Sequence, residues 1–520
     1  MSQRPLRLGT RRSLLARAQS GAVAGMLERA HPGLAVELVG IDTRGDRILD
    51  IPLSQVEGKE FFTAEIDAAL RAGTVDLTVH SFKDLSLERP AELCLGAVPE
   101  RENPRDIVLF AGDVRARLAA GAPLRIGSSS PRRQAFVPGF LERALPGRTA
   151  AGAARVTLCE LRGNVDTRLR RLREARGSER QLDGMILAFA GLARLWQDES
   201  VGAGAILREL LDGLPRMVLP LTLCPAAPAQ GALAIECRAE DTRTRALLAA
   251  IEHPATRQAV AAERVLLAER GGGCHQRFGA TQRHIDGLGS LLYVRSADAA
   301  GVAEPELRWS LPAPPQGPVR PWDGSAQAAP EIASLPDAAA ECARRLASVR
   351  AAFVAHRRAL PDMAAEEINR CPHIWVPGTE TWFALAARGV WVEGCAESLG
   401  FRDLRSVLAA PLLALPPPRE WLALTSREAL GGWGEVPVLA TYGHRPGPDA
   451  AAAQDAGPAP GTTQIWWHSG VQFERWHSRV AEECHHACGP GKTAESLRRA
   501  GVTALKVFPS VHHWREWLRS

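Results

Sequence analysis

The sequence has no long apolar segment and no strong excess of charge. Nowhere in its 520 residues do about 18 apolar residues follow one another, which excludes an ordinary transmembrane helix. The formal net charge of +5 is small for this length, so we expect neither a membrane nor a nucleic acid as a partner. The first residues, MSQRPLRLGTRRS, contain no apolar signal core, and we therefore expect a protein of the cytoplasm.

Paired cysteines are missing as well. The ten cysteines are scattered along the chain without a CxxC motif, which favours free thiols in a reducing compartment. The segment CHHAC, residues 484–488, brings two cysteines and two histidines together. No second pair of ligands accompanies it, so we expect no metal site there.

Lysine is scarce, because only four of the 63 basic residues are lysines. One of them, Lys83, stands beside Asp84 at the end of residues 75–85, VDLTVHSFKDL, whose first half alternates like a half-buried strand. In an open α/β sheet that end of a parallel strand faces the ligand crevice. A compact ammonium beside this carboxylate suggests a binding site, although a solvated ion pair on a surface turn explains the segment equally well.

Three strand-to-helix turns share one composition. Each presents a hydroxyl or amide side chain and one or two arginines near the start of a helix, where free N–H groups and the helix dipole favour anions. The residues concerned are Arg11 and Ser13 in the first turn, Ser130, Arg132 and Arg133 around Pro131 in the second, and Arg162, Asn164 and Arg168 in the third. One such turn is usually only a capped helix, whereas three together favour a site for several carboxylates or phosphates.

A run of three glycines, Gly271–Gly273, precedes Cys274. The glycines leave the backbone unhindered, so the thiol can sit in a tight turn against a bulky group. On this motif alone, a flexible loop with an incidental thiol is the better explanation.

The alternation of short strands and helices predicts an α/β protein. We expect a helix at about residues 338–356 and a domain boundary at residues 357–371, where the character of the sequence changes. Residues 446–461, PGPDAAAAQDAGPAPG, have the composition of a disordered connector.

The motifs above occur in a characteristic order over about the first 350 residues: TRRSLLARAQ, DTRGD, HSFKDL, ERENPRD, GSSSPRR, ELRGNVDTRL, PAAPAQGALAIECR and GGGC. In order and spacing they resemble the hydroxymethylbilane synthases, also called porphobilinogen deaminases. The resemblance implies two α/β lobes like those of periplasmic binding proteins, the first at residues 1–100 plus 200–222 and the second at residues 101–199. It also implies a small α+β domain that carries the cofactor, at residues 223–356 with its C-terminal helix.

The same resemblance implies a monomeric transferase that condenses four porphobilinogen molecules, with loss of ammonia, into the linear tetrapyrrole hydroxymethylbilane. Its primer would be a dipyrromethane cofactor, attached covalently through Cys274. Asp84 would be the catalytic residue, because it would stabilise the cationic azafulvene and move protons. The carboxylates of substrate and cofactor would be bound by Arg11, Ser13, Lys59, Ser81, Lys83, Ser130, Arg132, Arg133, Arg162, Arg168 and Arg194.

The chain departs from the family pattern at several positions. Pro131, Ala64 and Ser86 stand where Leu, Lys and Pro are usual, and there are insertions around residues 146–154 and 173–181. None of these changes removes a proposed catalytic residue. We expect them to alter substrate affinity and loop motion rather than the reaction.

Residues 371–520 resemble uroporphyrinogen-III synthase in the segments VPGTETWFALAARGVWVEGCAESLGF, LALTSREAL and CGPGKTAESLRRAGV. The glycine-proline turn of that family corresponds to residues 489–493, so Thr493 would begin a helix at the substrate cleft. That enzyme closes the linear tetrapyrrole into a ring. Two α/β lobes hardly fit into this length of chain, so a degenerate remnant of the enzyme is an equal alternative.

A protein of another class has the same general features. Paired lobes with anion-binding turns also form solute-binding proteins without catalytic activity. Such a binder needs neither Asp84 nor Cys274, and we therefore favour the enzyme.

Overall fold

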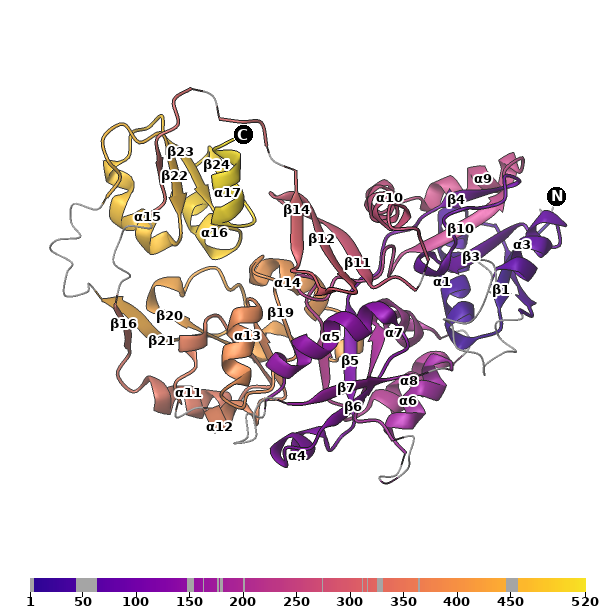
Figure 1. Ribbon diagram of the computed structural model, residues 1–520, viewed down its shortest axis with the longest axis horizontal. Coiled ribbons are helices and arrows are strands. Elements are labelled where there is room, and N and C mark those ends of the chain that lie inside the picture. Colours follow the sequence, from indigo (N-terminus) through magenta and orange to yellow (C-terminus); the bar gives the residue numbers. More distant parts are fainter. Residues whose placement is uncertain are drawn as a thin grey trace.

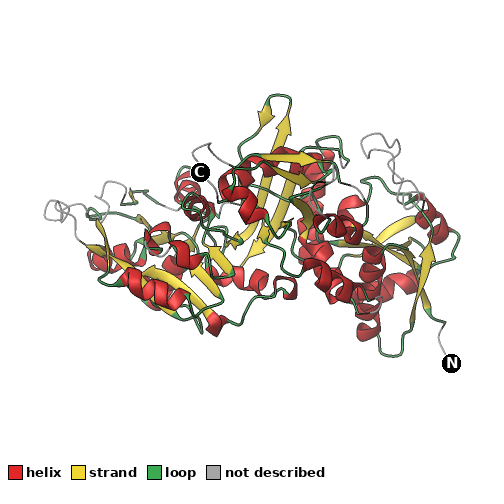
Figure 2. Ribbon diagram, turned by 90° about the horizontal axis from the view of Figure 1, so that it is seen from below, coloured by secondary structure: helices red, strands yellow, loops and turns green. Residues whose placement is uncertain are grey.

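The computed structural model describes residues 4–43, 63–146, 154–161, 163–174, 177, 181–199, 202–273, 275–310, 312–315, 317–324, 331–362, 365–445 and 457–520. Three predicted site residues, Lys59, Arg162 and Cys274, lie outside these ranges. None of the described helices is long and apolar enough to cross a membrane. The molecule is elongated, with the N-terminal sheet at one end and the C-terminal α/β units at the other (Figures 1 and 2).

The first lobe is built on a five-stranded sheet. In spatial order its strands are β2 (Val36–Ile41), β1 (Leu6–Arg11), β3 (Leu77–Ser81), β10 (Leu233–Arg238) and β4 (Leu93–Ala97). β1 is parallel to β2 and β3, whereas β10 is antiparallel to both of its neighbours. Helix α1 (Leu14–Ala30) buries Val23 and Leu27 against this sheet, and α3 (Ala64–Arg71) precedes β3.

The second lobe has a sheet of the same size. In spatial order its strands are β7 (Val156–Cys159), β6 (Leu124–Gly127), β8 (Gly184–Ala188), β5 (Asp106–Phe110) and β9 (Arg216–Val218). Its helices are α4 (Val114–Ala119), α5 (Pro131–Ala144), α6 (Val165–Leu172), α7 (Phe189–Gln197) and α8 (Ala203–Leu211). The chain crosses between the lobes twice, from β4 to β5 and back from β9 to β10. We call these two connections the hinge crossings.

The third domain follows β10. Helices α9 (Thr242–Leu248) and α10 (Pro254–Ala268) lead to an antiparallel sheet. The strands of that sheet are β11 (Phe278–Ile285), β12 (Gly289–Asp298), β13 (Gly301–Val302) and β14 (Glu306–Trp309). In Figure 1 this domain lies between the first lobe and the C-terminal half.

The C-terminal half contains two further α/β lobes. The sheet of the first has the order β16 (Glu331–Ser334), β21 (Val438–Arg445), β20 (Trp421–Ser426), β17 (Ala351–Val354), β18 (His373–Val376) and β19 (Gly394–Cys395). The sheet of the second is parallel throughout, with β15 (Pro321–Trp322), β22 (Gln464–Trp467), β23 (His485–Cys488) and β24 (Leu505–Val507). Their helices are α11 (Ala338–Leu346), α12 (Ala365–Ile368), α13 (Thr379–Ala386), α14 (Phe401–Leu408), α15 (Gly470–Trp476), α16 (Lys492–Arg499) and α17 (Val511–Trp517).

The predicted fold class is confirmed, but the structure moves several boundaries. The expected helix at residues 338–356 ends at Leu346, and the last part of that range is strand β17. The four residues of β17 are all buried, and periodicity cannot distinguish so short an apolar run from a helix. Because β16 and β17 pair with strands beyond residue 371, the C-terminal sheets begin before the boundary predicted at residues 357–371.

The division between the first two lobes also differs from our expectation. Residues 200–222 were assigned to the first lobe, yet β9 pairs with β5 and α8 packs on α7, both in the second lobe. β10, which we placed in the third domain, completes the sheet of the first lobe. A strand that pairs with partners more than a hundred residues away cannot be located by local pattern.

Candidate functional site

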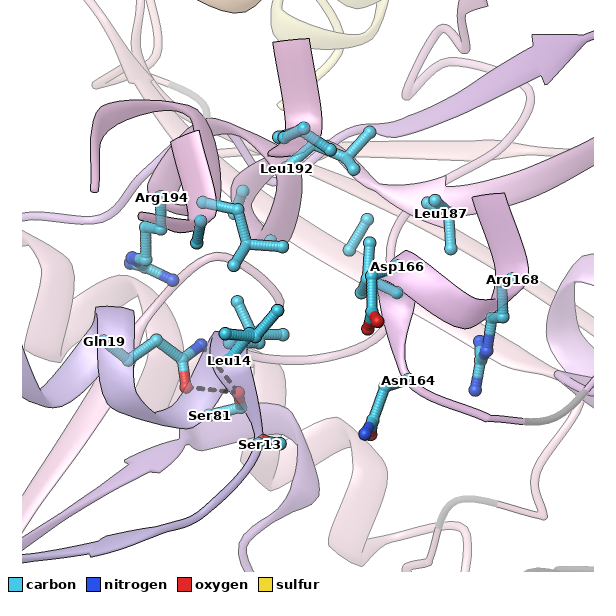
Figure 3. Close-up of a pocket in the computed structure, with 18 of the residues that line it drawn as sticks. Ser13, Leu14, Gln19, Ser81, Asn164, Asp166, Arg168, Leu187, Leu192 and Arg194 are labelled. Atoms are coloured by element: carbon cyan, nitrogen blue, oxygen red, sulfur yellow. Dashed lines mark hydrogen bonds between the residues drawn. The ribbon is translucent and has the colours of Figure 1, made fainter. Parts of the chain in front are cut away.

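A cavity of about 540 Å³ lies between the first two lobes. Figure 3 shows Gln19 and Ser81 of the first lobe on one side and Asn164, Asp166 and Arg168 of the second lobe on the other. The predicted site residues that line it are Arg11, Ser13, Ser81, Lys83, Asp84, Arg133, Arg168 and Arg194. Ser130 and Arg132 do not line the cavity. The structure therefore brings together residues from all three of the predicted strand-to-helix turns and from the Lys83-Asp84 turn.

The turn after β3 carries the central pair of this site. Ser81 ends the strand, and its hydroxyl lies 2.9 Å from Gln19 Nε2 of α1. The next three residues, Phe82–Asp84, form a short 3₁₀ turn that leaves Lys83 half-buried and Asp84 exposed to the cavity. Lys83 Nζ donates to Gln230 Oε1 at 3.3 Å. Burial lowers the pKa of Lys83, and the positive charges of Arg133 and Arg132 lower it further, whereas Asp84 opposes the shift.

The backbone of this turn is held from behind by Arg264 of α10. Its guanidinium donates to the carbonyl oxygens of Phe82, Leu85 and Ser86 at 3.3, 3.0 and 2.8 Å. One arginine with several donors in a fixed plane can satisfy such a set of acceptors. The turn that carries Lys83 and Asp84 is therefore anchored to the third domain.

Asp106, the first residue of β5, organises the arginines of the second turn. It is fully buried and accepts from Arg132 Nη2 and Arg133 Nη2, each at 2.7 Å, and from Gln230 Nε2 at 2.8 Å. Burial alone would raise the pKa of Asp106, but the two guanidinium charges hold it well below its usual range. Arg132 also donates to Pro225 O, which turns it away from the cavity. Arg133 alone of the two arginines faces the cavity.

Both predicted serines act as helix caps. Ser13 accepts from Ala16 N at the start of α1, and Ser130 accepts from Arg133 N at the start of α5. Pro131 occupies the first helical turn, as predicted. Arg11, which we expected near the start of the helix, is the last residue of β1, because the pairing of β1 with β2 continues to that residue.

The remaining arginines belong to helices of the second lobe. Arg168 of α6 donates from Nε to Gly163 O at 2.7 Å. Arg194 of α7 donates from Nη2 to Gly231 O, which lies on the return to the first lobe, at 2.6 Å. Burial lowers the pKa of Arg194, but it remains a cation at neutral pH. A bound polyanion would meet cationic groups from both lobes.

The glycine loop before Cys274 packs close to the turn that carries Asp84. Gly272 has a left-handed φ of +70°, and a Cβ there would come within 2.9 Å of Leu87 Cδ1, three residues beyond Asp84. Only glycine fits this position without displacing Leu87. The described part of the loop therefore packs next to the segment that follows Asp84.

Sequence reasoning missed several residues of the site. Asp106 and Gln230 lie within the motifs ERENPRD and PAAPAQGALAIECR, but nothing local indicates that they meet. Gln19 and Arg264 sit on helices whose spacing predicts only a buried face. Contacts between distant elements assign these four residues to the site.

One group of residues in the described part of the chain has the composition of a metal site. It consists of Asp67, His80 and Glu236, all of them buried. Arg89 already bridges it, with Nη2 at 2.6 Å from Asp67 Oδ1 and 2.7 Å from Glu236 Oε2. The guanidinium supplies the positive charge that a metal would otherwise bring.

Thr493 lies far from this cavity, in the first turn of α16. Its hydroxyl donates to His468 O, at the end of β22, over 3.4 Å. The turn before it meets the other C-terminal lobe, since a Cβ on Gly400 would lie 2.7 Å from Gly491 Cα. Thr493 is thus placed near the junction of the two C-terminal lobes.

Sequence comparison places the N-terminal half among known enzymes. The family model for "Porphobilinogen deaminase, dipyromethane cofactor binding domain" matches residues 6–246. A porphobilinogen deaminase of Roseiflexus castenholzii is 43% identical over 289 residues, which cover 55% of this chain and 84% of the relative. One of Geobacter metallireducens is 42% identical over 274 residues, which cover 53% of this chain and 76% of the relative.

Likeness to solved structures is weaker. YhfZ from Shigella flexneri is 15% identical, and the match covers 52% of this chain and 94% of that chain with a TM-score of 0.23. A TM-score this low does not establish a shared fold. The two-lobed arrangement is instead evident from the strand orders of the two N-terminal sheets.

Proposed function

The chain belongs to the porphobilinogen deaminase (hydroxymethylbilane synthase) family of transferases, and from this premise we propose how its residues perform that reaction. Four porphobilinogen molecules and one water react in the cavity between the lobes, giving hydroxymethylbilane by head-to-tail condensation with the release of four molecules of ammonia. One observation carries the assignment of roles: Asp84 opens onto a cavity that is also lined by Arg11, Lys83, Arg168 and Arg194. A carboxylate among cations suits a positively charged intermediate whose side chains are anionic.

The family carries a dipyrromethane cofactor, and we propose that Cys274 holds it. When bound, this cofactor supplies the pyrrole to which the first substrate is joined. Gly272, two residues before Cys274, packs against Leu87, three residues beyond Asp84, which supports this assignment. The arginines and Lys83 then bind acetate and propionate groups of the pyrroles.

Asp84 acts on the substrate. Its carboxylate opposes the positive charge that develops as ammonia leaves, and it moves protons between the pyrrole nitrogen and the amine. General acid–base help of this kind contributes about 10²–10⁴ in rate. Lys83 and Arg133 fix the substrate carboxylates nearby, so that the reacting carbon lies next to Asp84.

Mass spectrometry of the intact full chain tests the attachment. We expect an excess equal to two pyrrole units in the unaltered protein and in Cys159→Ser, whose thiol is half-buried in the second lobe. The excess is absent in Cys274→Ser, which loses activity. An unmodified protein with full activity would exclude this role of Cys274.

We propose a second activity for the C-terminal half, the closure of the linear product into the type III ring. The short length expected from the sequence argued for a remnant, but two lobes occupy residues 321–520. Thr493 follows the carboxyl end of a parallel strand where these lobes meet, the usual position of a ligand site in α/β sheets. The isomer composition of the oxidised product decides between the cyclase and the remnant.

A further inference from the structure

The C-terminal half joins the second lobe of the deaminase edge to edge. Val218 N of β9 donates to Glu393 O, directly before β19, at 2.7 Å. Trp391 Nε1 donates to Arg216 O at 3.3 Å, and its ring meets that of Phe110 edge-on, with centroids 5.2 Å apart. The contact covers an open sheet edge and buries large aromatic side chains.

A strained turn projects from this junction. After β19 the backbone passes through Glu397 with φ +52° and Ser398 with φ +64°. Two successive residues other than glycine in the left-handed region are unusual, and such strain persists only where the surroundings impose it. The turn is held by Ser398 N, which donates to Pro377 O at 2.7 Å. This backbone geometry places the Glu397 side chain against the hinge crossings.

The carboxylate of Glu397 contacts both crossings of the deaminase hinge. On the first crossing, Arg105 donates from Nε to Glu397 Oε1 at 3.0 Å. On the second, Leu221 N donates to the same oxygen at 2.9 Å. The side chains of Glu397 and Arg105 are 0% and 4% exposed, so water does not replace either contact. Arg283 of the third domain lies 3.8 Å from the other oxygen.

The first crossing continues directly into the substrate site. Arg105 is followed by Asp106, which holds Arg132, Arg133 and Gln230. Gln230 in turn accepts from Lys83, next to Asp84. A displacement of the hinge at Arg105 is therefore passed to the cationic groups of the cavity through hydrogen bonds between buried groups.

We propose that Glu397 is a positioning residue for the deaminase reaction. The C-terminal half supplies a carboxylate that ties the two hinge crossings together and so fixes the spacing of the lobes around the cavity. This role needs no chemistry in the C-terminal lobes and holds whether or not they close the ring.

Glu397→Gln in the full chain tests the proposal. The amide keeps the size of the side chain but removes the charge opposite Arg105. We expect kcat/KM for porphobilinogen to fall by about 10- to 100-fold, as for a small misplacement of reacting groups. Hydrogen exchange should accelerate at residues 101–105 and 219–222, while the strands of the first lobe keep their protection.

Asp403→Asn is the matched control. Asp403 forms a similar ion pair between the same C-terminal lobe and Arg283, at 3.2 Å, but among the described residues its side chain has no direct hydrogen bond or ion pair to a hinge crossing. We expect kcat/KM and hinge exchange of this variant to stay within about twofold of the unaltered protein. An equal loss in both variants would mean that Glu397 only docks the two halves, and the proposal would be wrong.

A double variant covers the case in which Glu397→Gln does not fold. Arg105→Met with Glu397→Leu replaces the buried pair by apolar side chains, an exchange that proteins often tolerate. We expect a folded protein with a Tm near that of the unaltered chain, but with the same loss of kcat/KM and the same faster hinge exchange. Normal turnover in the double variant, or in a folded Glu397→Gln, would overturn the proposal.

Discussion

The guanidinium of Arg264 lies 4.7 Å from the centre of the Phe82 ring and donates to the carbonyl oxygen of the same residue. This contact joins helix α10, which leads to the glycine loop and Cys274, to the turn that carries Asp84. One side chain of α10 thus holds the turn that carries Asp84. The position of Asp84 depends on the third domain as well as on the sheet of the first lobe.

Arg264→Met should therefore damage both stability and turnover. Three carbonyls of the turn lose their donor, which should lower the free energy of unfolding by about 1–3 kcal/mol. The freed turn should lower kcat by roughly tenfold or more, because Asp84 is no longer held in place. Urea unfolding and initial rates with porphobilinogen measure the two effects.

Arg475→Met is the control for this variant. The guanidinium of Arg475 lies 4.9 Å from the centre of the Trp476 ring in a C-terminal lobe. This variant therefore also loses a contact between a cation and an aromatic ring. We expect kcat to remain unchanged. If Arg264→Met lost stability and kept its kcat, the contact would stabilise the fold without positioning Asp84.

Asp84→Asn separates chemistry from assembly. The amide keeps the shape of the side chain but neither accepts a proton nor balances a positive charge. We expect an intact mass that still includes the dipyrromethane and a kcat lowered by about 10²–10⁴. The release of ammonia measures turnover, and a normal rate would show that the acid–base role belongs to another group.

Lys83 should give the deaminase reaction a characteristic pH dependence. Burial lowers the pKa of this residue, so its ammonium loses the proton at a lower pH than an exposed lysine does. Only the protonated form attracts a carboxylate, and kcat/KM should therefore fall as pH rises through the lowered pKa. In Lys83→Arg the cation persists, and this alkaline fall should move to higher pH.

The pH profiles of kcat/KM must be compared only where both proteins are folded. Circular dichroism at each pH checks this condition. Superimposable profiles of Lys83→Arg and the unaltered protein would show that Lys83 does not bind substrate carboxylates. A uniform loss of kcat/KM without a displaced profile would indicate a steric effect of the larger guanidinium.

Features fixed by neighbouring residues were predictable from the sequence. The caps at Ser13 and Ser130 and the turn after β3 depend on residue types within one helical turn or strand end. The pairing of Asp106 with Arg132 and Arg133 was not predictable, because it joins a strand to a helix some 25 residues later through tertiary packing. The same holds for Arg105 and Glu397, which are separated by 292 positions.

The domain boundary predicted at residues 357–371 was wrong for a related reason. Strands β16 and β17 are four residues each, and their assignment to the C-terminal sheet depends on partners such as β20 and β21. Short buried strands carry little periodicity of their own. The error mattered for function, because it made the C-terminal half seem too small for two lobes.

Thr493→Val tests the activity proposed for that half. The hydroxyl stands at the N-terminal turn of α16, where it and the free backbone N–H groups can orient a carboxylate of the linear tetrapyrrole. We expect the full chain to give type III uroporphyrin after oxidation of the product, and Thr493→Val to give mainly type I by spontaneous closure. Ammonia release should stay at the normal rate, since Thr493 lies outside the deaminase cavity.

Thr493→Ser keeps the hydroxyl and should retain the type III product. Chromatography of the oxidised porphyrins distinguishes the isomers, and the normal ammonia release confirms that each variant still supplies the linear substrate. If the unaltered chain yields only type I, the C-terminal half is a remnant and its contribution is limited to the support of the deaminase hinge. If Thr493→Val still gives type III uroporphyrin, the C-terminal half is a cyclase and Thr493 has no part in ring closure.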